Sequence, residues 1–317
     1  MRIAVVGAGA IGGFIAAALA RSGADVAVIA RGAHLEVIQR KGITLVQSDL
    51  GAFTARVEAS DDLRTLGAFD AVLVTFKAHQ YRELLPQLAS VAATGASIVT
   101  LQNGVPFWYA RTPAVEAVDP GGRIAGLFPD ERIVGGVVHV SGHIVEPGKI
   151  HQSGGMRYAF GAPGGGTNDR VAAIAAAFAS AELAPQVDEN VRGTIWLKLV
   201  NNVGLNPVST LHGLTIRQML ERASTRDEVR TLMHEALAVG QALGVVDDVD
   251  IEARIAYAER LADVRTSMLQ DYQAGRPLEI DPILGAVVEI GQRLGVAVPH
   301  VRDVYERLRT MSGATTA

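Results

Sequence analysis

The fold of this chain is decided close to its start, where residues 3–12 read IAVVGAGAIG. The first four of these residues are apolar, and an apolar run with glycines directly behind it is typical of a buried parallel strand. The next six match the pattern G-x-G-x-x-G, and an Ala- and Leu-rich stretch over residues 10–21 indicates that the turn opens a helix. This is the context that the pattern requires in order to bind a dinucleotide.

The three glycines of the turn have different expected tasks. Gly7 allows the tight turn, Gly9 lets the backbone approach a pyrophosphate, and Gly12 lets the helix pack closely on the strand. The helix N-terminus adds unpaired N–H groups and a positive partial charge. The alternative is a turn that only helps packing. The predicted cofactor-binding residues of the turn are Gly7, Ala8, Gly9, Ala10, Ile11 and Gly12.

Arg31 follows a second apolar run, residues 26–29, and predicts which cofactor binds. NAD-binding domains usually carry Asp or Glu at this point for the ribose 2′-hydroxyl, whereas a guanidinium suits the 2′-phosphate of NADP. The arginine therefore favours NADPH over NADH. The alternative is a solvated arginine in a loop.

The order of the remaining segments indicates two domains. Buried strands are expected at residues 71–75 and 98–101, and strands that alternate with helices predict a doubly wound parallel sheet. The last part of the chain indicates helix almost throughout. We therefore expect an α/β fold, with an N-terminal Rossmann-type doubly wound sheet over residues 1–187 and a C-terminal all-helical domain over residues 188–317. Further short strands are predicted at residues 43–46, 53–57, 134–140, 143–146, 149–152 and 157–161.

The composition excludes several classes of protein. Lys and Arg total 29 against 33 Asp and Glu, a net charge of −4, so nothing indicates nucleic acid or an anionic membrane as a partner. The absence of cysteine rules out disulfides and thiolate chemistry, and the eight histidines do not cluster with carboxylates, so no metal site is predicted. The apolar run at the start is too short for a signal peptide, and no stretch has the length of a membrane span. We expect a cytoplasmic protein.

Two polar residues follow directly after predicted strands. Lys77 comes after residues 71–75, and Asn103 comes after residues 98–101. Because ligands of such sheets bind beyond the carboxyl ends of the strands, both are expected at the same crevice. An asparagine donates and accepts hydrogen bonds at once, which suits a carboxamide or a ribose. The alternative for each residue is an ordinary polar group of a loop.

The clearest catalytic signal is a polar row on a helix near residue 200. Lys198, Asn202 and Asn206 recur every four residues on one face of an otherwise apolar helix, which the following Pro207 is expected to kink. No carboxylate lies on that row, and a buried lysine without a partner is costly, so the lysine should line a cavity. Desolvation would lower its pKa and make it a better proton donor. The alternative is a lysine that snorkels to solvent beside asparagines that cap their neighbours.

Glu279 is the candidate carboxylate for this site. It lies between two apolar residues, after a helix in which Ser267 sits late and before a helix that Asp281 would cap. A junction between helices is a good place from which to aim one carboxylate into a cleft. The alternative is a surface charge.

Taken together, these residues resemble the ketopantoate reductases, a family of NADPH-dependent enzymes. The resemblance covers nearly the whole chain, and seven motifs in the right order are far more specific than any single one. The seven are residues 7–12, Arg31, residues 74–80 (VTFKAHQ), residues 101–104 (LQNG), Lys198 and Leu199 with Asn202 and Asn206, residues 267–271 (SMLQD), and residues 279–281.

The resemblance implies a role for each candidate residue. Lys198 is implied as the general acid that protonates the ketone oxygen, and Glu279 as the residue that holds the substrate hydroxyl and helps to place the lysine. Asn103 is implied to contact both cofactor and substrate, in a cleft between a Rossmann domain and a helical domain. The other implied roles are substrate binding for Asn202, Asn206 and Ser267, and NADPH binding for Arg31 and Lys77.

The chain departs from the family pattern after Gly104, where aromatics at residues 106–109 and a loop through residue 122 replace a short polar helix. Aromatic side chains there would reshape the substrate pocket. Three hypotheses follow: reduction of ketopantoate to pantoate in pantothenate biosynthesis, a related NADP-dependent reaction on another 2-oxo or 2-hydroxy acid, or a non-catalytic NADP-binding sensor. For both enzymes the expected partner is a small 2-oxo acid, and a homodimer is an option that the sequence leaves open.

Overall fold

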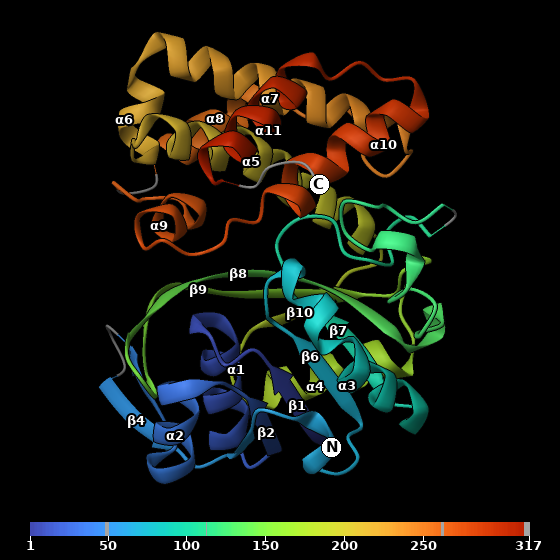
Figure 1. Ribbon diagram of the computed structural model, residues 1–317, viewed down its shortest axis with the longest axis vertical. Helices are drawn as coiled ribbons and strands as arrows, with labels where there is room; N and C mark the ends of the chain where they lie inside the picture. Colours follow the sequence, from blue (N-terminus) through green and yellow to red (C-terminus); the bar gives the residue numbers. More distant parts are fainter. Residues whose placement is uncertain (48–50, 112, 261–262, 314–317) are drawn as a thin grey trace. The chain divides into compact units, whose positions relative to one another are not determined.

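The chain forms two compact units (Figure 1). The sheet unit comprises Met1–Gln102 and Arg123–Val191, and the helical unit comprises Asn103–Gly122 and Arg192–Ala317. A short segment from the middle of the chain therefore belongs to the helical unit. The computed structural model describes residues 1–47, 51–111, 113–260 and 263–313.

The sheet unit holds one mixed sheet. Its described strands follow the order β4-β3-β9-β8-β7-β6-β1-β2-β5, and β10 pairs with β9 outside this path. Along the path from β8 to β5 neighbouring strands are parallel, whereas the pairs β8–β9 and β3–β4 are antiparallel. The predicted α/β class is confirmed. The strands are β1 (Arg2–Val6), β2 (Asp25–Ile29), β3 (Ile43–Gln47), β4 (Gly51–Ala55), β5 (Glu58–Ser60), β6 (Ala71–Val74), β7 (Ser97–Thr100), β8 (Ile133–Glu146), β9 (Lys149–Gly161) and β10 (Pro185–Val187).

Three neighbouring parallel strands, β6, β1 and β2, end level with one another beside the edge strand β5. Val6 of β1 pairs with Ile29 of β2 on one side and with Val74 of β6 on the other. The segments that follow these strands therefore start from the same edge of the sheet. The strand order reverses at β1, and this is where open α/β sheets bind their ligands.

The strands β8 and β9 are longer than the sequence predicted. Ser141 pairs with Gly154 and Gly142 pairs with Gln152, so the ladder shifts register by one residue and then continues. Four short strands were predicted here because the serines and glycines resemble turn residues. That prediction was wrong, since the sheet absorbs them as β-bulges. The hairpin predicted at 43–46 and 53–57 is confirmed as β3 and β4.

Apolar helix faces complete the core of the sheet unit. Phe14 and Leu19 of α1 and Phe178 of α4 are buried, and the ring of Phe178 meets those of Tyr158 and Phe160 edge to face. The helices are α1 (Ala10–Arg21), α2 (Gly32–Lys41), α3 (Tyr81–Thr94) and α4 (Asp169–Ser180). The 3₁₀ turns are η1 (Leu63–Thr65), η2 (Ala78–Gln80), η3 (Pro120–Gly122), which lies in the helical unit, and η4 (Asp130–Arg132).

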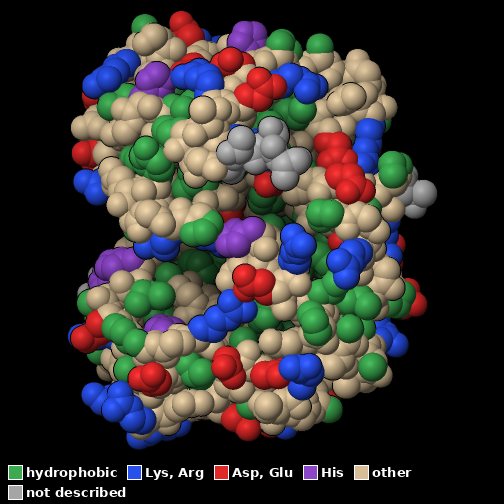
Figure 2. Space-filling view, in the orientation of Figure 1, with side chains coloured by type: hydrophobic (Ala, Val, Ile, Leu, Met, Phe, Trp, Pro, Cys, Tyr) green, Lys and Arg blue, Asp and Glu red, His purple; other side chains and the backbone are tan. Residues whose placement is uncertain are grey.

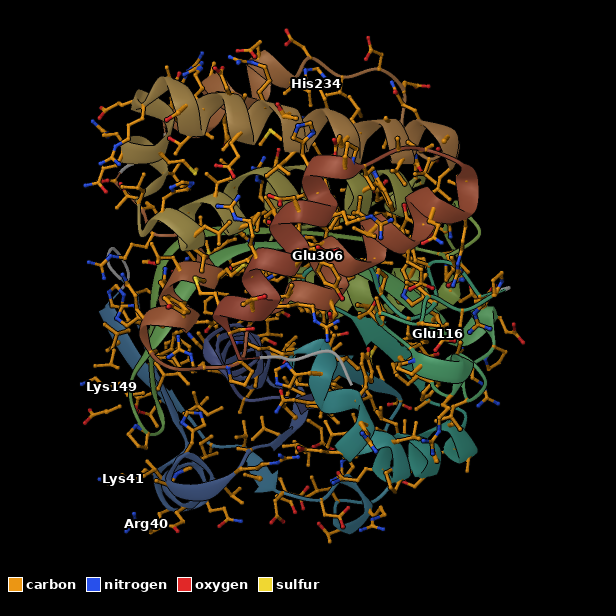
Figure 3. The ribbon with its side chains drawn as sticks, turned by 45° about the horizontal axis from the view of Figure 1, so that its top comes forward. Arg40, Lys41, Glu116, Lys149, His234 and Glu306 are labelled. Carbon is orange, nitrogen blue, oxygen red and sulfur yellow. The ribbon has the colours of Figure 1, made fainter. Side chains whose placement is uncertain are left out.

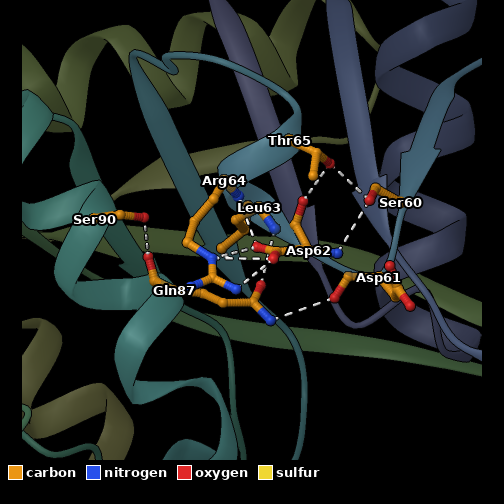
Figure 4. A network of polar contacts seen from close by, with 8 residues as sticks. All are labelled: Ser60, Asp61, Asp62, Leu63, Arg64, Thr65, Gln87 and Ser90. Carbon is orange, nitrogen blue, oxygen red and sulfur yellow. Dashed lines mark hydrogen bonds and ion pairs between the residues drawn. The ribbon is translucent and has the colours of Figure 1, made fainter.

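Two local features stabilise the ends of secondary structure in the sheet unit. α2 ends in Arg40 and Lys41, which project outward in Figure 3 and whose positive charges suit a helix C-terminus. In the network of Figure 4, Asp62 accepts the N–H of Arg64 at 2.9 Å, and hydrogen bonding to Arg64 holds the pKa of this carboxyl below its usual value. Gln87 of α3 also belongs to this network, and its hydrogen bond to Leu63 connects η1 to α3.

The helical unit is built around α5. Trp196 and Val203 of this helix are buried, and Trp196 Nε1 donates to the carbonyl oxygen of Ala236 at 2.9 Å. A Cβ on Gly240 would lie 2.2 Å from Trp196 Nε1, so only a glycine allows this close packing. As predicted, the unit has no strand among its described residues. Its elements are α5 (Val191–His212), α6 (Ile216–Glu221), α7 (Ala223–Ala242), α8 (Ile251–Glu259), α9 (Ser267–Gln273), the π-helix η5 (Asp281–Gly285), α10 (Ala286–Leu294) and α11 (Pro299–Met311).

Several helix ends differ from the predictions. α5 includes Pro207 and continues to His212, and the kink expected at this proline stays a prediction. Ser267 is the first residue of the short helix α9 rather than a late one. Asp281 is not a cap: Ile280 already has helical angles, and the Asp281 carboxylate instead accepts a hydrogen bond from the Tyr305 hydroxyl at 2.8 Å.

The distribution of charged side chains on the surface agrees with the small net charge of the chain. On the face drawn in Figure 2, acidic and basic side chains are interspersed. Within the described part of the chain, no helix is long and apolar enough to cross a membrane. Nor do its residues include a group of three or more His, Asp or Glu side chains placed to hold a metal ion.

Candidate active site

The glycine turn connects β1 to α1. Gly7 has a φ of +102°, a conformation that favours glycine, and a Cβ there would lie 2.8 Å from the backbone nitrogen of Phe76. A Cβ on Gly12 would lie 2.1 Å from the carbonyl oxygen of Gly7, whereas no described neighbour lies within 4 Å of the corresponding position on Gly9. Packing thus requires two of the glycines, and the third leaves open the approach to the N-terminus of α1. This arrangement fits the pyrophosphate of a dinucleotide.

Thr75 completes the turn, although the sequence pattern did not single it out. Its hydroxyl donates to the carbonyl oxygens of Val6 at 3.0 Å and Gly7 at 2.8 Å. The same hydroxyl would lie 2.2 Å from a Cβ on Gly12. The available signal was a hydroxyl residue at the point where a buried apolar strand stops.

Arg31 and Lys77 follow β2 and β6 at the edge of the sheet that carries the turn. The Arg31 guanidinium lies 2.7 Å from the Glu83 carboxylate, with side-chain exposures of 52% and 62%. Exposed ion pairs of this kind contribute about 0–1 kcal/mol, so the guanidinium remains available to a phosphate. Lys77 is partly buried, and its N–H donates to the side-chain oxygen of Gln80 at 3.1 Å.

Lys198 lies in the second turn of α5, close in sequence to the buried apolar residues Trp196 and Leu199. Burial lowers its pKa to about 8, and the negative charge of Glu279 opposes this shift. The ammonium group is therefore mostly protonated at neutral pH, yet it gives up its proton far more readily than an ordinary lysine.

Glu279 reaches this cluster from the link between α9 and η5. Its Oε2 accepts a hydrogen bond from Asn103 Nδ2 at 3.3 Å, although the two residues are 176 positions apart in the sequence. Its charge also acts on Lys198. The lysine, the glutamate and the asparagine thus form one polar cluster in the helical unit, and the sequence predicted all three.

Close backbone contacts hold Asn103 in place. The N–H of Val105 donates to the carbonyl oxygen of Pro282 at 2.8 Å. Gly104 has a φ of +82°, and a Cβ there would lie 2.5 Å from the same oxygen. The residue after Asn103 must therefore be a glycine for the segment to dock on η5.

The other predicted substrate residues have different environments. Asn202 Nδ2 is buried and has no hydrogen-bond partner among the described residues, although buried donors are nearly always paired. Asn206 is 6% exposed, and its carbonyl oxygen accepts the Thr210 hydroxyl at 2.7 Å. Ser267 is exposed on the first turn of α9.

The aromatic residues after Gly104 belong to the core of the helical unit. Phe107, Trp108 and Tyr109 are each at most 2% exposed. The ring of Tyr109 lies 5.6 Å from that of Trp196, and its hydroxyl donates to the carbonyl oxygen of Arg192 at 2.8 Å. The segment therefore packs on the start of α5, two residues before Lys198. The predicted reshaping of the substrate pocket stays a prediction.

Comparison with protein families identifies the relatives of this chain. Residues 3–165 match the model of ketopantoate reductase PanE/ApbA, and residues 190–312 match the model of its C-terminal part. The chain belongs to the ketopantoate reductase family. The resemblance inferred from the motifs is thereby confirmed, and the protein is an oxidoreductase of the NAD(P)-dependent kind.

Individual matches to known proteins cover at least 98% of the chain. A 2-dehydropantoate 2-reductase of Mesorhizobium japonicum is 38% identical over 320 residues, which span 98% of each protein. The crystal structure of 2-dehydropantoate 2-reductase from Methylococcus capsulatus has a TM-score of 0.83 and 31% identity, and the match covers 100% of this chain and 98% of that one. D-Mandelate dehydrogenase, solved with NADH and anilino(oxo)acetate, has a TM-score of 0.85 at 22% identity and 99% coverage of both chains, a similarity of fold alone.

Proposed function

We propose that this protein reduces 2-dehydropantoate (ketopantoate) to pantoate with NADPH, in pantothenate biosynthesis. The observation that carries the proposal is the cluster of Lys198, Glu279 and Asn103, in which a lysine with a pKa of about 8 lies beside a carboxylate. The 38% identity to a 2-dehydropantoate 2-reductase over nearly the whole chain supports the choice of substrate.

Lys198 is the proton donor of this reaction. A nicotinamide cofactor, when bound, supplies the hydride that adds to the carbonyl carbon of the 2-oxo acid. Lys198 Nζ gives its proton to the carbonyl oxygen, which becomes the hydroxyl of the product. A pKa of about 8 suits this task, since the group is charged at neutral pH and its proton is easily transferred. Glu279 keeps the lysine charged by opposing the effect of burial.

The substrate is held by the polar side chains around the lysine. The unpaired Nδ2 of Asn202 donates to an oxygen of the substrate, which supplies the missing partner of a buried group. Asn206 and Ser267 bind the carboxylate and the hydroxyl, as the family resemblance implies. Asn103 is placed by its hydrogen bond to Glu279 and contacts substrate and cofactor.

NADPH is the preferred cofactor in this proposal. Arg31 follows β2 where the adenosine ribose of a dinucleotide is expected, and its guanidinium forms an exposed ion pair with Glu83. A 2′-phosphate offers the guanidinium a stronger partner than a carboxylate at the surface. Lys77, after β6, adds a second positive charge at the same edge of the sheet.

A comparison of four reactions tests the proposal. NADPH or NADH oxidation is followed optically with ketopantoate and, in parallel, with phenylpyruvate. We expect turnover with NADPH and ketopantoate to exceed the other three combinations, and Arg31→Ala to lose affinity for NADPH but not for NADH. Faster reduction of phenylpyruvate would instead favour a related enzyme for an aromatic 2-oxo acid, and NADPH binding without turnover of either acid would favour a sensor.

A further inference from the structure

His34 joins two segments of the sheet unit that lie far apart in the sequence. The residue is part-buried in the first turn of α2. Its Nε2 lies 2.7 Å from the carbonyl oxygen of Ala8 in the glycine turn, and its Nδ1 accepts the N–H of Gly148 at 3.0 Å. Gly148 lies in the tight connection between β8 and β9.

These two contacts define the protonation of the ring. A backbone N–H can only donate, so Nδ1 must carry a lone pair. Nε2 must then carry the hydrogen, since it faces a carbonyl oxygen. His34 is therefore a neutral imidazole with the proton on Nε2. Neither the other tautomer nor the imidazolium satisfies both Ala8 and Gly148.

The Ala8 carbonyl belongs to the peptide that precedes Gly9, the N-cap of α1. The N–H of the same peptide donates to the carbonyl oxygen of Gly7 at 2.7 Å. Because a peptide is planar, His34 on one side and Gly7 on the other fix its orientation. Thr75 donates to the two preceding carbonyl oxygens, so side chains hold three consecutive carbonyl groups from the end of β1 into the turn. The N–H groups at the start of α1 then keep a fixed direction for a phosphate.

The β8–β9 hairpin supports this arrangement from a second side. A Cβ on Gly148 would lie 2.5 Å from Val37 of α2, and a Cβ on Gly13 would lie 2.2 Å from Ile150 of β9. The end of the hairpin is thus packed against both α2 and the first turns of α1. His34 is the side chain that connects the hairpin to the turn by hydrogen bonds.

We propose that His34 is a positioning residue for dinucleotide binding, which locks the phosphate-binding turn to the β8–β9 hairpin. This inference rests on the proposed function, because it assigns His34 to the cofactor site. His34 acts on the peptide that faces the pyrophosphate, which NADPH and NADH share. Removal of the His34 side chain must therefore weaken the binding of both cofactors by the same factor, in contrast to removal of the Arg31 side chain.

The experiment measures the dissociation constants of NADPH and NADH by fluorescence titration. We expect His34→Ala to raise both constants about tenfold, which corresponds to about 1.4 kcal/mol. His34→Gln, which keeps a donor and an acceptor, should recover most of this loss. The matched control is Gln39→Ala, since Gln39 also lies on α2 and donates to a backbone oxygen, that of Ala59, away from the turn. We expect this variant to bind both cofactors as the wild type does.

Several results would overturn the inference. Unchanged affinities in His34→Ala, an equal loss in Gln39→Ala, or a loss confined to NADPH would each contradict it. Nitrogen-15 NMR of the unsubstituted protein adds an independent check, because a proton on Nδ1 of His34 is incompatible with the two contacts. If the wild type bound neither nucleotide, the proposed function would fail together with this inference. If the wild type and His34→Ala bound both nucleotides with equal affinity, only the inference would fail.

Discussion

The pKa of Lys198 is determined by the surroundings of its side chain. An ammonium group that loses hydration among apolar side chains becomes easier to deprotonate, and a nearby carboxylate limits this effect. The sequence revealed the first factor, because a lysine on an apolar helix is conspicuous. It did not reveal the contact between Glu279 and Asn103 by spacing, since 176 positions separate them and no local pattern encodes such a distance. The family resemblance implied a site role for each of the two residues separately, and their contact is visible only in the fold.

The pH dependence of the reaction follows from this environment. In the proposed reduction the protonated lysine is the acid, so kcat/KM should be constant below a pH of about 8 and fall roughly tenfold per pH unit above it. In Glu279→Gln the charge that raises the pKa is removed, and the fall should begin at lower pH. The measurement is a pH profile of ketopantoate reduction for both proteins. An unshifted profile in the variant would show that another group limits the rate.

At the scale of elements, the start of the chain was the most predictable part. The run from β1 through the turn to α1 depends on neighbouring residues, and its apolar pattern and glycines identify it locally. The strands β8 and β9 were less predictable, because Ser141 and Gly142 have the same composition as a turn but lie in a bulge. Whether such residues end a strand depends on its partner in the sheet, which the local sequence does not contain.

The glycine turn yields a prediction at this scale. Gly9→Ala should leave thermal stability nearly unchanged, since nothing described lies within 4 Å of the new Cβ, but it should weaken NADPH binding by about tenfold or more because the methyl group occupies the approach of the pyrophosphate. Thermal unfolding and NADPH titration are the measurements. Gly154→Ala in β9 is the control, as its Cβ also meets nothing within 4 Å. Equal NADPH affinity in both variants would contradict the assigned role of the turn.

At the scale of the whole molecule, the chain divides into two units that are each built from two separate stretches of sequence, which the sequence alone did not predict. The sequence indicated one boundary, placed after residue 187, and this division stays a prediction. The segment Asn103–Gly122 is grouped with the helical unit because its apolar side chains, including Trp108 and Tyr109, are buried there. The local sequence of the segment does not indicate which element it packs against, since its burial against α5 is a long-range contact.

The core of the helical unit should depend strongly on Trp196. The side chain is fully buried, so Trp196→Ala should cost about 3–5 kcal/mol of the free energy of unfolding. Tyr257→Ala is the matched control, because Tyr257 is an aromatic residue of the same unit with 57% exposure. Denaturant titration compares the two variants. A similar small effect of both would show that α5 is not the centre of this unit.

The kcat of Lys198→Ala measures whether Lys198 donates the proton in the proposed reduction of ketopantoate. The protein without this side chain should bind NADPH with unchanged affinity, while kcat with ketopantoate falls by about 10²–10⁴, the usual contribution of a general acid. Lys41→Ala, which removes an exposed lysine at the end of α2 (Figure 3), should leave both quantities unaltered. A Lys198→Ala protein that binds NADPH and keeps the wild-type kcat would show that Lys198 is not the proton donor.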